Sequence, residues 1–148
     1  MTPRGWIAIS LLAAAATQVL PALALPAQSL DRTRSMAETQ HEIVMVLLQK
    51  KDFPRAAAEA NKIFVMKWPD DQEPMLLQEL LFFADQFLHQ GQPALGVQLL
   101  ENNSKNFKAV RSRISICKEK GYLYKEMNES DKALESFREA QRLERNGS

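Results

Sequence analysis

The sequence predicts an all-α domain of six helices that pair into three antiparallel hairpins. Three observations support this class. Apolar residues recur at helical spacing, no segment of useful length alternates as a strand would, and turn-forming residues interrupt the apolar pattern at regular intervals. Of the 148 residues, 45% are apolar and 25% are charged, which are the proportions of an ordinary globular domain rather than a disordered chain.

The first 24 residues are expected to be a secretory signal peptide. The basic residue Arg4 precedes an apolar stretch over residues 6–16, and the sequence Ala-Leu-Ala at 22–24 offers small residues for cleavage. Cleavage after Ala27 is the second choice, and an uncleaved, membrane-anchored N-terminus is the alternative. We therefore expect a protein that is exported, periplasmic or secreted, with no integral membrane span once the signal is removed.

The helical domain is expected to cover residues 36–147, after a linker at 25–35. Its first hairpin pairs a helix over 36–50 with an alanine-rich helix over 54–67. A proline opens the second of these helices, where its missing N–H leaves no bond unmade. The Trp-Pro pair at 68–69 ends the same helix, because a residue before proline avoids the helical region.

The second and third hairpins follow from similar turn signals. The second joins a helix that ends near His89 to a helix that Pro93 opens, with Gly91 at the turn. The third joins a long helix that starts near Ser104 to a final helix over 131–145. A serine immediately before this final helix is a good N-cap.

The third hairpin carries a repeat pattern. Over residues 114–147 the sequence fits G-x2-Y…A-x3-F-x2-A, and the matching residues are Gly121, Tyr124, Ala133, Phe137 and Ala140. The hairpin thus resembles a tetratricopeptide repeat, in which small residues let two helices approach while aromatic side chains fill the remaining space. Cys117, Lys120 and Arg145 replace the usual Trp, Leu and Pro of that pattern.

The two earlier hairpins match the pattern less closely. Aligned on Gly91, the small positions are taken by Ala84 and Gly96 and an aromatic position by Phe87. In the first hairpin Ala60 is small where an aromatic residue is usual. The repeats start near residues 37, 77 and 114, at spacings of 40 and 37, against about 34 for the family. The resemblance implies a short right-handed superhelix, and an unrelated six-helix bundle is the alternative.

The resemblance also implies a partner-binding groove along the first helices of the three pairs. An apolar floor with a few polar groups suits a bound peptide, because apolar burial gives affinity and hydrogen bonds fix the register. The groove residues expected by position are His41, Met45, Leu48, Gln78, Leu81, Asp85, Leu88, Lys118, Tyr122 and Lys125. The alternative is that the apolar members are core residues of a closed bundle. The family's clamp for a C-terminal carboxylate is absent, since Met45 and Asp85 hold its asparagine positions.

These observations favour an interaction module over an enzyme: an adaptor or scaffold in a cell-envelope complex. We expect its partner to be a protein or peptide segment, or a second copy of the chain, because no capping helix follows the third hairpin. The balance of 19 basic and 18 acidic residues argues against nucleic acid. One cysteine, two histidines and no phosphate-binding or nucleophile motif indicate no metal, cofactor or catalytic residues.

Two other functions remain as alternatives. The basic stretch over 105–125 could bind anionic glycan or lipid headgroups, against the simpler interpretation of a solvated helix face. A small helical hydrolase could use paired carboxylates such as Glu38 and Glu42, although such pairs are common on solvated helices. Cys117 is interpreted as a small buried hydrophobe, with an intermolecular disulfide as the alternative.

Overall fold

The computed structural model describes residues 25–147, and in that range it contains helices and no strand. Its six α-helices are α1 (Leu25–Gln49), α2 (Phe53–Phe64), α3 (Glu73–His89), α4 (Pro93–Asn103), α5 (Val110–Glu126) and α6 (Ser130–Asn146). Two short 3-10 helices, η1 (Asp70–Gln72) and η2 (Ser104–Asn106), lie in the connections after α2 and α4. The all-α class predicted from the sequence is confirmed. The expected signal peptide, residues 1–24, lies outside the described residues.

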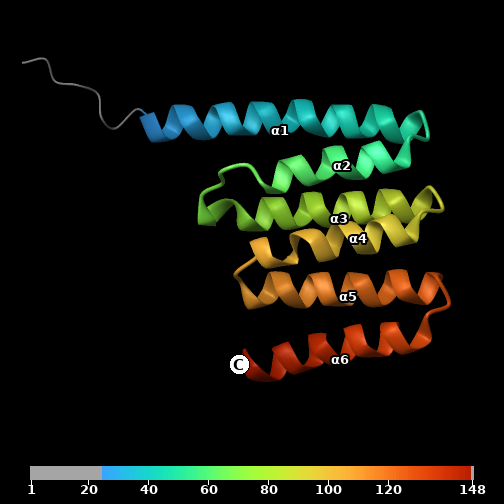
Figure 1. The fold of residues 1–148 in the computed structure, drawn as a ribbon. Helices are drawn as coiled ribbons and strands as arrows, with labels where there is room; N and C mark the ends of the chain where they lie inside the picture. Colours follow the sequence, from blue (N-terminus) through green and yellow to red (C-terminus); the bar gives the residue numbers. More distant parts are fainter. Residues whose placement is uncertain (1–24, 148) are drawn as a thin grey trace, which may run out of the picture.

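The helices run up and down in a layered stack, each roughly antiparallel to the next (Figure 1). Contacts are most extensive within the pairs α1–α2, α3–α4 and α5–α6. Adjoining pairs meet mainly through α2–α4, α4–α5 and α3–α5. Three tight turns lie at one end of the stack, and the two longer connections lie at the other end (Figure 1).

The first helix is longer than the sequence predicted. Residues 25–35, assigned to a linker, form about three turns at the start of α1. The segment is polar, which favoured the linker, but it contains no glycine and can continue a helix that is packed further along. Arg34 connects this segment to η1, because its Nη2 donates a hydrogen bond of 2.8 Å to Gln72 Oε1.

The fifth helix starts later than predicted. Residues expected to open it form η2, which is followed by the extended residue Phe107 (φ −104°, ψ 117°). Phe107 is only 4% exposed and belongs to the hydrophobic core. Burial of the Phe107 side chain therefore interrupts a segment whose local sequence predicts a continuous helix.

A side chain from α3 holds the start of α5. The backbone N–H groups of Lys108 and Ala109 donate to the two carboxylate oxygens of Glu73, at 3.1 and 2.9 Å. Burial raises the pKa of Glu73, but hydrogen bonds from Ser112 and from these two N–H groups outweigh burial and lower its pKa overall. Glu73 thus satisfies free N–H groups at a helix start 36 residues away.

The turns within the three pairs share one geometry. Each contains one residue with a left-handed backbone: Lys51 (φ 58°), Gly91 (φ 72°) and Asn128 (φ 57°). The N–H of the following residue donates to the carbonyl five positions earlier, at 2.9, 2.8 and 2.9 Å respectively, which is the closing bond of a Schellman motif. The left-handed residues are 40 and 37 positions apart, equal to the spacings of the sequence pattern.

The turn geometry predicts a stabilising substitution at the first turn. Lys51 holds a conformation that is unfavourable for a residue with a Cβ, whereas Gly91 adopts it without strain. We expect Lys51→Gly to raise the free energy of unfolding by about 0.5–1 kcal/mol, after the greater freedom of glycine in the unfolded chain is counted. Urea unfolding measures this change. The matched control Gly91→Lys should shift stability in the opposite direction, and a stabilising Gly91→Lys would contradict the shared geometry.

The two helices of each pair approach closely next to these turns. The position five residues after each left-handed residue is small and buried in all three pairs: Ala56, Gly96 and Ala133. A methyl group added to Gly96 would lie 3.0 Å from the carbonyl oxygen of Ala84. A methyl group added to Gly121 would lie 2.6 Å from the ring of Phe137. The close approach expected at Gly121 is therefore present, with the Phe137 ring filling the space that the glycine leaves.

Candidate functional site

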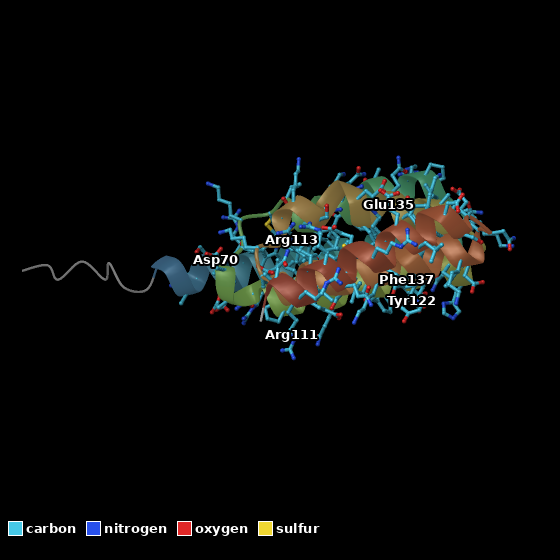
Figure 2. All side chains as sticks on the ribbon, turned by 90° about the horizontal axis from the view of Figure 1, so that it is seen from below. Asp70, Arg111, Arg113, Tyr122, Glu135 and Phe137 are labelled. Carbon is cyan, nitrogen blue, oxygen red and sulfur yellow. The ribbon has the colours of Figure 1, made fainter. Side chains whose placement is uncertain are left out.

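The first helix of each pair contributes to one side of the stack. Met45, Asp85 and Tyr122 each lie six residues before the left-handed residue of their turn, so they are equivalent positions on α1, α3 and α5. Figure 2 looks along the stack and shows Tyr122 on this side, with Glu135 of α6 on the opposite side. We call this side, where His41, Phe82 and Tyr122 are the aromatic-ring residues, the inner face.

The structure separates the expected groove residues by exposure. Four are exposed: Gln78, Lys118, Tyr122 and Lys125. Five are partly buried: His41, Met45, Leu81, Asp85 and Leu88. Leu48 is only 2% exposed and belongs to the core, so assigning it to a groove is wrong. Met45, Leu81 and Leu88 also pack against the core, but part of each side chain remains exposed at the surface.

His41 is the point where α1 and α3 join at the inner face. Its Nδ1 lies 2.5 Å from Glu79 Oε1. Its ring stacks on Phe82 with centroids 5.4 Å apart and lies 5.2 Å from the ring of Phe83. Phe82 remains 37% exposed, whereas Phe83 is fully buried. The junction thus presents one aromatic ring to solvent and anchors another in the core.

Sequence reasoning missed Phe82 and Glu79. Phe82 lies four residues after Gln78 and three before Asp85, so helical spacing already placed it beside two expected groove residues. The pairing of Glu79 with His41 has no such signal, because it depends on how α1 is rotated against α3. That rotation is set by packing between the two helices, and the paired residues are 38 positions apart in the chain.

The third pair contributes an exposed tyrosine and an ion pair. Tyr122 is 53% exposed and meets the Phe137 ring edge-on, with centroids 5.2 Å apart. Lys118 Nζ lies 2.6 Å from Glu144 Oε1, and this hydrogen bond raises the pKa of Lys118. Both side chains thus contact α6, Lys118 through an ion pair and Tyr122 through an aromatic ring.

A cavity of about 250 Å³ opens between α1, the end of α2 and α3. We call it the α1–α3 cavity. Its apolar lining consists of Ala37, Ile63, Trp68, Met75 and Leu76. Its charged or titratable lining consists of Arg34, Glu38, His41, Glu42 and Glu79. Since His41 belongs both to this cavity and to the inner face, the two adjoin at this side chain.

The basic stretch over 105–125 does not form a single positive surface. Lys108 pairs with Asp70 at 2.8 Å, and Lys120 pairs with Glu101 at 2.9 Å. Figure 2 places Arg111 at the margin that also carries Tyr122, and Arg113 away from that margin. The positive charges are therefore dispersed and partly neutralised.

The glutamates of the domain, including the pair Glu38 and Glu42 considered for catalysis, lie in different surroundings. Glu38 and Glu42 are exposed and line the α1–α3 cavity. Glu139 accepts hydrogen bonds of 2.7 and 2.5 Å from Arg142, which hold its pKa below the usual value. Glu119 behaves in the opposite way, because burial and then the charge of Asp85 raise its pKa.

Cys117 is partly buried. Its exposure is thus intermediate between the buried hydrophobe expected from the sequence and a fully exposed thiol. Burial and the charge of Glu139 raise its pKa, so the unreactive thiol form is favoured.

Within residues 25–147 no group of three or more His, Cys, Asp or Glu side chains is arranged to hold a metal ion. No helix of that same range combines the length and the apolar character that crossing a membrane requires.

The two end helices of the stack differ in their outward surfaces. On α1, Met36, Ile43 and Val46 are 53%, 41% and 50% exposed and share one side by helical spacing. On α6, the charged residues Glu135 and Arg138 are exposed, and so is Leu134, at 51%. Large exposed apolar side chains therefore occur on both end helices, three on α1 and one on α6.

No protein-family model matches this sequence, and neither a curated protein nor a solved structure shows significant similarity to it.

Proposed function

We propose that this protein is an exported, tetratricopeptide-like interaction module that acts as an adaptor or scaffold in a cell-envelope complex. In this proposal three stacked hairpins form a short right-handed superhelix. A peptide segment of a partner protein lies across α1, α3 and α5. The observation that carries the proposal is the inner face, to which the first helix of each pair contributes side chains and on which the rings of Phe82 and Tyr122 are exposed.

The recurrence of one hairpin supports the repeat interpretation. The same left-handed turn with the same closing hydrogen bond occurs at 51, 91 and 128, although this motif also ends many unrelated helices. The spacing of the three turns and the small residue five positions after each of them favour a repeated hairpin over an unrelated bundle. Adjoining pairs contact each other through α2–α4, α4–α5 and α3–α5, which fits a stack in which each hairpin packs on its neighbours.

The exposed aromatic residues support a role in binding. Phe82 and Tyr122 are 37% and 53% exposed on a domain whose other phenylalanines are buried or partly buried. Aromatic side chains are enriched in protein interfaces, where they supply much of the binding energy. Each of these two rings is already oriented by a second ring, His41 or Phe137, so little freedom is lost on binding.

Site-specific photo-crosslinking in the native cell tests this proposal. A photoreactive phenylalanine analogue replaces Phe82 or Tyr122, and matched control positions are the exposed residues Gln98 on α4 and Glu135 on α6. We expect both inner-face positions to crosslink to the same protein and the control positions not to. Equal yields at all four positions, or none at any, would contradict the proposal. A product of twice the chain mass would instead indicate self-association.

The binding contribution of the two rings gives a further expected result. Phe82→Ala together with Tyr122→Ala should weaken partner binding at least a hundredfold, because two interface aromatic residues each contribute about 2 kcal/mol when truncated. Binding is measured with the crosslinked protein once it is identified, and far-ultraviolet circular dichroism should remain unchanged. Gln98→Ala is the matched control and should leave binding as it was. Unchanged binding by the double variant would move the contact surface elsewhere.

A further inference from the structure

We infer that the α1–α3 cavity binds a single basic side chain, lysine or arginine, of the partner segment. The inference rests on the proposed function and adds to it the chemistry of one anchor residue. It follows from the size of the cavity, its apolar wall, the charge at its rim and the His41 side chain that it shares with the inner face.

The size of the cavity suits one side chain. Pockets that enclose drug-sized ligands measure about 300–1,000 Å³, and the α1–α3 cavity is smaller than these at about 250 Å³. Its wall is formed by aliphatic and thioether groups of Ile63, Met75 and Leu76. A methylene stem of lysine or arginine can be buried along such a wall while the charged end stays at the rim.

The charge around the cavity favours a cation. Three carboxylates, those of Glu38, Glu42 and Glu79, line it against the one guanidinium of Arg34. The Arg34 group donates to Gln72 Oε1 at 2.8 Å, which directs it toward η1. Whether or not His41 carries a proton, the acidic groups outnumber the basic ones. An anionic side chain would be repelled, and a neutral one would gain no electrostatic attraction from these carboxylates.

Trp68 adds a second attraction for a cation. Its indole Nε1–H donates to the Ile63 carbonyl oxygen at 2.8 Å, which fixes the ring at the cavity wall. A lysine ammonium or an arginine guanidinium is attracted to the face of an indole ring more strongly than to other aromatic rings. The apolar wall, the carboxylates at the rim and the fixed indole ring therefore all favour a side chain with an apolar stem and a cationic end.

The position of the cavity makes such a side chain an anchor. His41 lines the cavity and also stacks on the exposed Phe82 at the inner face, with centroids 5.4 Å apart. A segment that crosses α1 and α3 over Phe82 also passes His41, which lines the cavity. One residue of that segment can then point inward while its neighbours contact the inner face.

Binding of short model peptides tests the inference without the native partner. The probes are five-residue alanine peptides, blocked at both ends, whose central residue is lysine, arginine, norleucine or citrulline. Trp68 fluorescence reports occupancy, in a protein where Trp6→Phe removes the other tryptophan. We expect the lysine and arginine peptides to bind at least tenfold more tightly than their neutral counterparts. Equal binding of the norleucine peptide, or no binding of any peptide, would overturn the inference.

Matched variants separate the rim charge from general effects. Glu42→Gln should weaken the lysine peptide about fivefold, in line with the loss of one partly exposed charge pair. Glu135→Gln removes another exposed carboxylate, which lies on the side of the stack opposite Tyr122, and should change nothing (Figure 2). An equal effect of both variants would mean that only net charge matters, which would contradict a site at the cavity.

A free amine distinguishes a partner side chain from a small ligand. Butylammonium supplies the same cation and stem without a peptide backbone. It should bind more weakly than the lysine peptide, and equal or tighter binding would assign the cavity to small amines instead. Failure in any of these measurements leaves the crosslinking result at Phe82 and Tyr122 untouched, so this inference and the proposed function fail separately.

Discussion

Replacing Gly96 with valine is expected to lower the free energy of unfolding by about 2–3 kcal/mol. An added Cβ would lie 3.0 Å from the carbonyl oxygen of Ala84 and 3.2 Å from Leu123 Cδ1. The first contact is with backbone, so α3 itself would have to shift, and overpacking of this kind destabilises by about 1–3 kcal/mol. Valine adds two more methyl groups at the place where α3, α4 and α5 meet.

Two other substitutions on α4 isolate the packing contribution. Gly96→Ala should be close to neutral, because alanine improves helix propensity by about 1 kcal/mol and a single methyl needs only a small shift. Ala94→Val places the same side chain at an exposed position of α4 and should destabilise by about 0.5 kcal/mol. Urea unfolding compares the three. If Gly96→Val loses no more stability than Ala94→Val, the close approach of α3 and α4 is not a constraint on this fold.

The sequence predicted the helices and turns well because their signals are local. Pro54, Gly91 and Pro93 act through their own backbone, and apolar spacing acts within one helix. The late start of α5 was not predictable in this way. It depends on Phe107 turning into the core and on Glu73 receiving hydrogen bonds from a segment 36 residues away, which no local pattern encodes.

The candidate site was predicted only in part for the same reason. Gln78, Asp85 and Tyr122 stay predicted groove residues with exposed or partly exposed side chains, whereas Leu48 is buried between neighbouring helices, which helical spacing could not show. Trp68 was interpreted only as a helix terminator, because Trp-Pro is a strong stop signal. Its place in the wall of the α1–α3 cavity follows from how the α2–α3 connection folds back, which depends on tertiary contacts.

Stability and binding should separate at two adjacent phenylalanines of α3. Phe83 is fully buried beneath the junction of α1 and α3 and lies 5.2 Å from the His41 ring. We expect Phe83→Ala to lower the free energy of unfolding by about 3–5 kcal/mol, because it leaves a cavity that the surrounding helices cannot fill. Phe83→Leu retains most of the volume and should lose much less stability.

Phe82→Ala is the matched comparison, since it removes the same group one position earlier. Its ring is partly exposed, stacks on His41 and meets the edge of the Phe83 ring, with centroids 5.4 and 5.6 Å away, so the expected loss of stability is about 1 kcal/mol. Partner crosslinking at Tyr122 should nevertheless fall sharply in Phe82→Ala and persist in Phe83→Leu. If urea unfolding finds the two alanine variants equally destabilised, Phe82 is a core residue. The inner face would then lose the side chain that links the α1–α3 cavity to the rest of the surface.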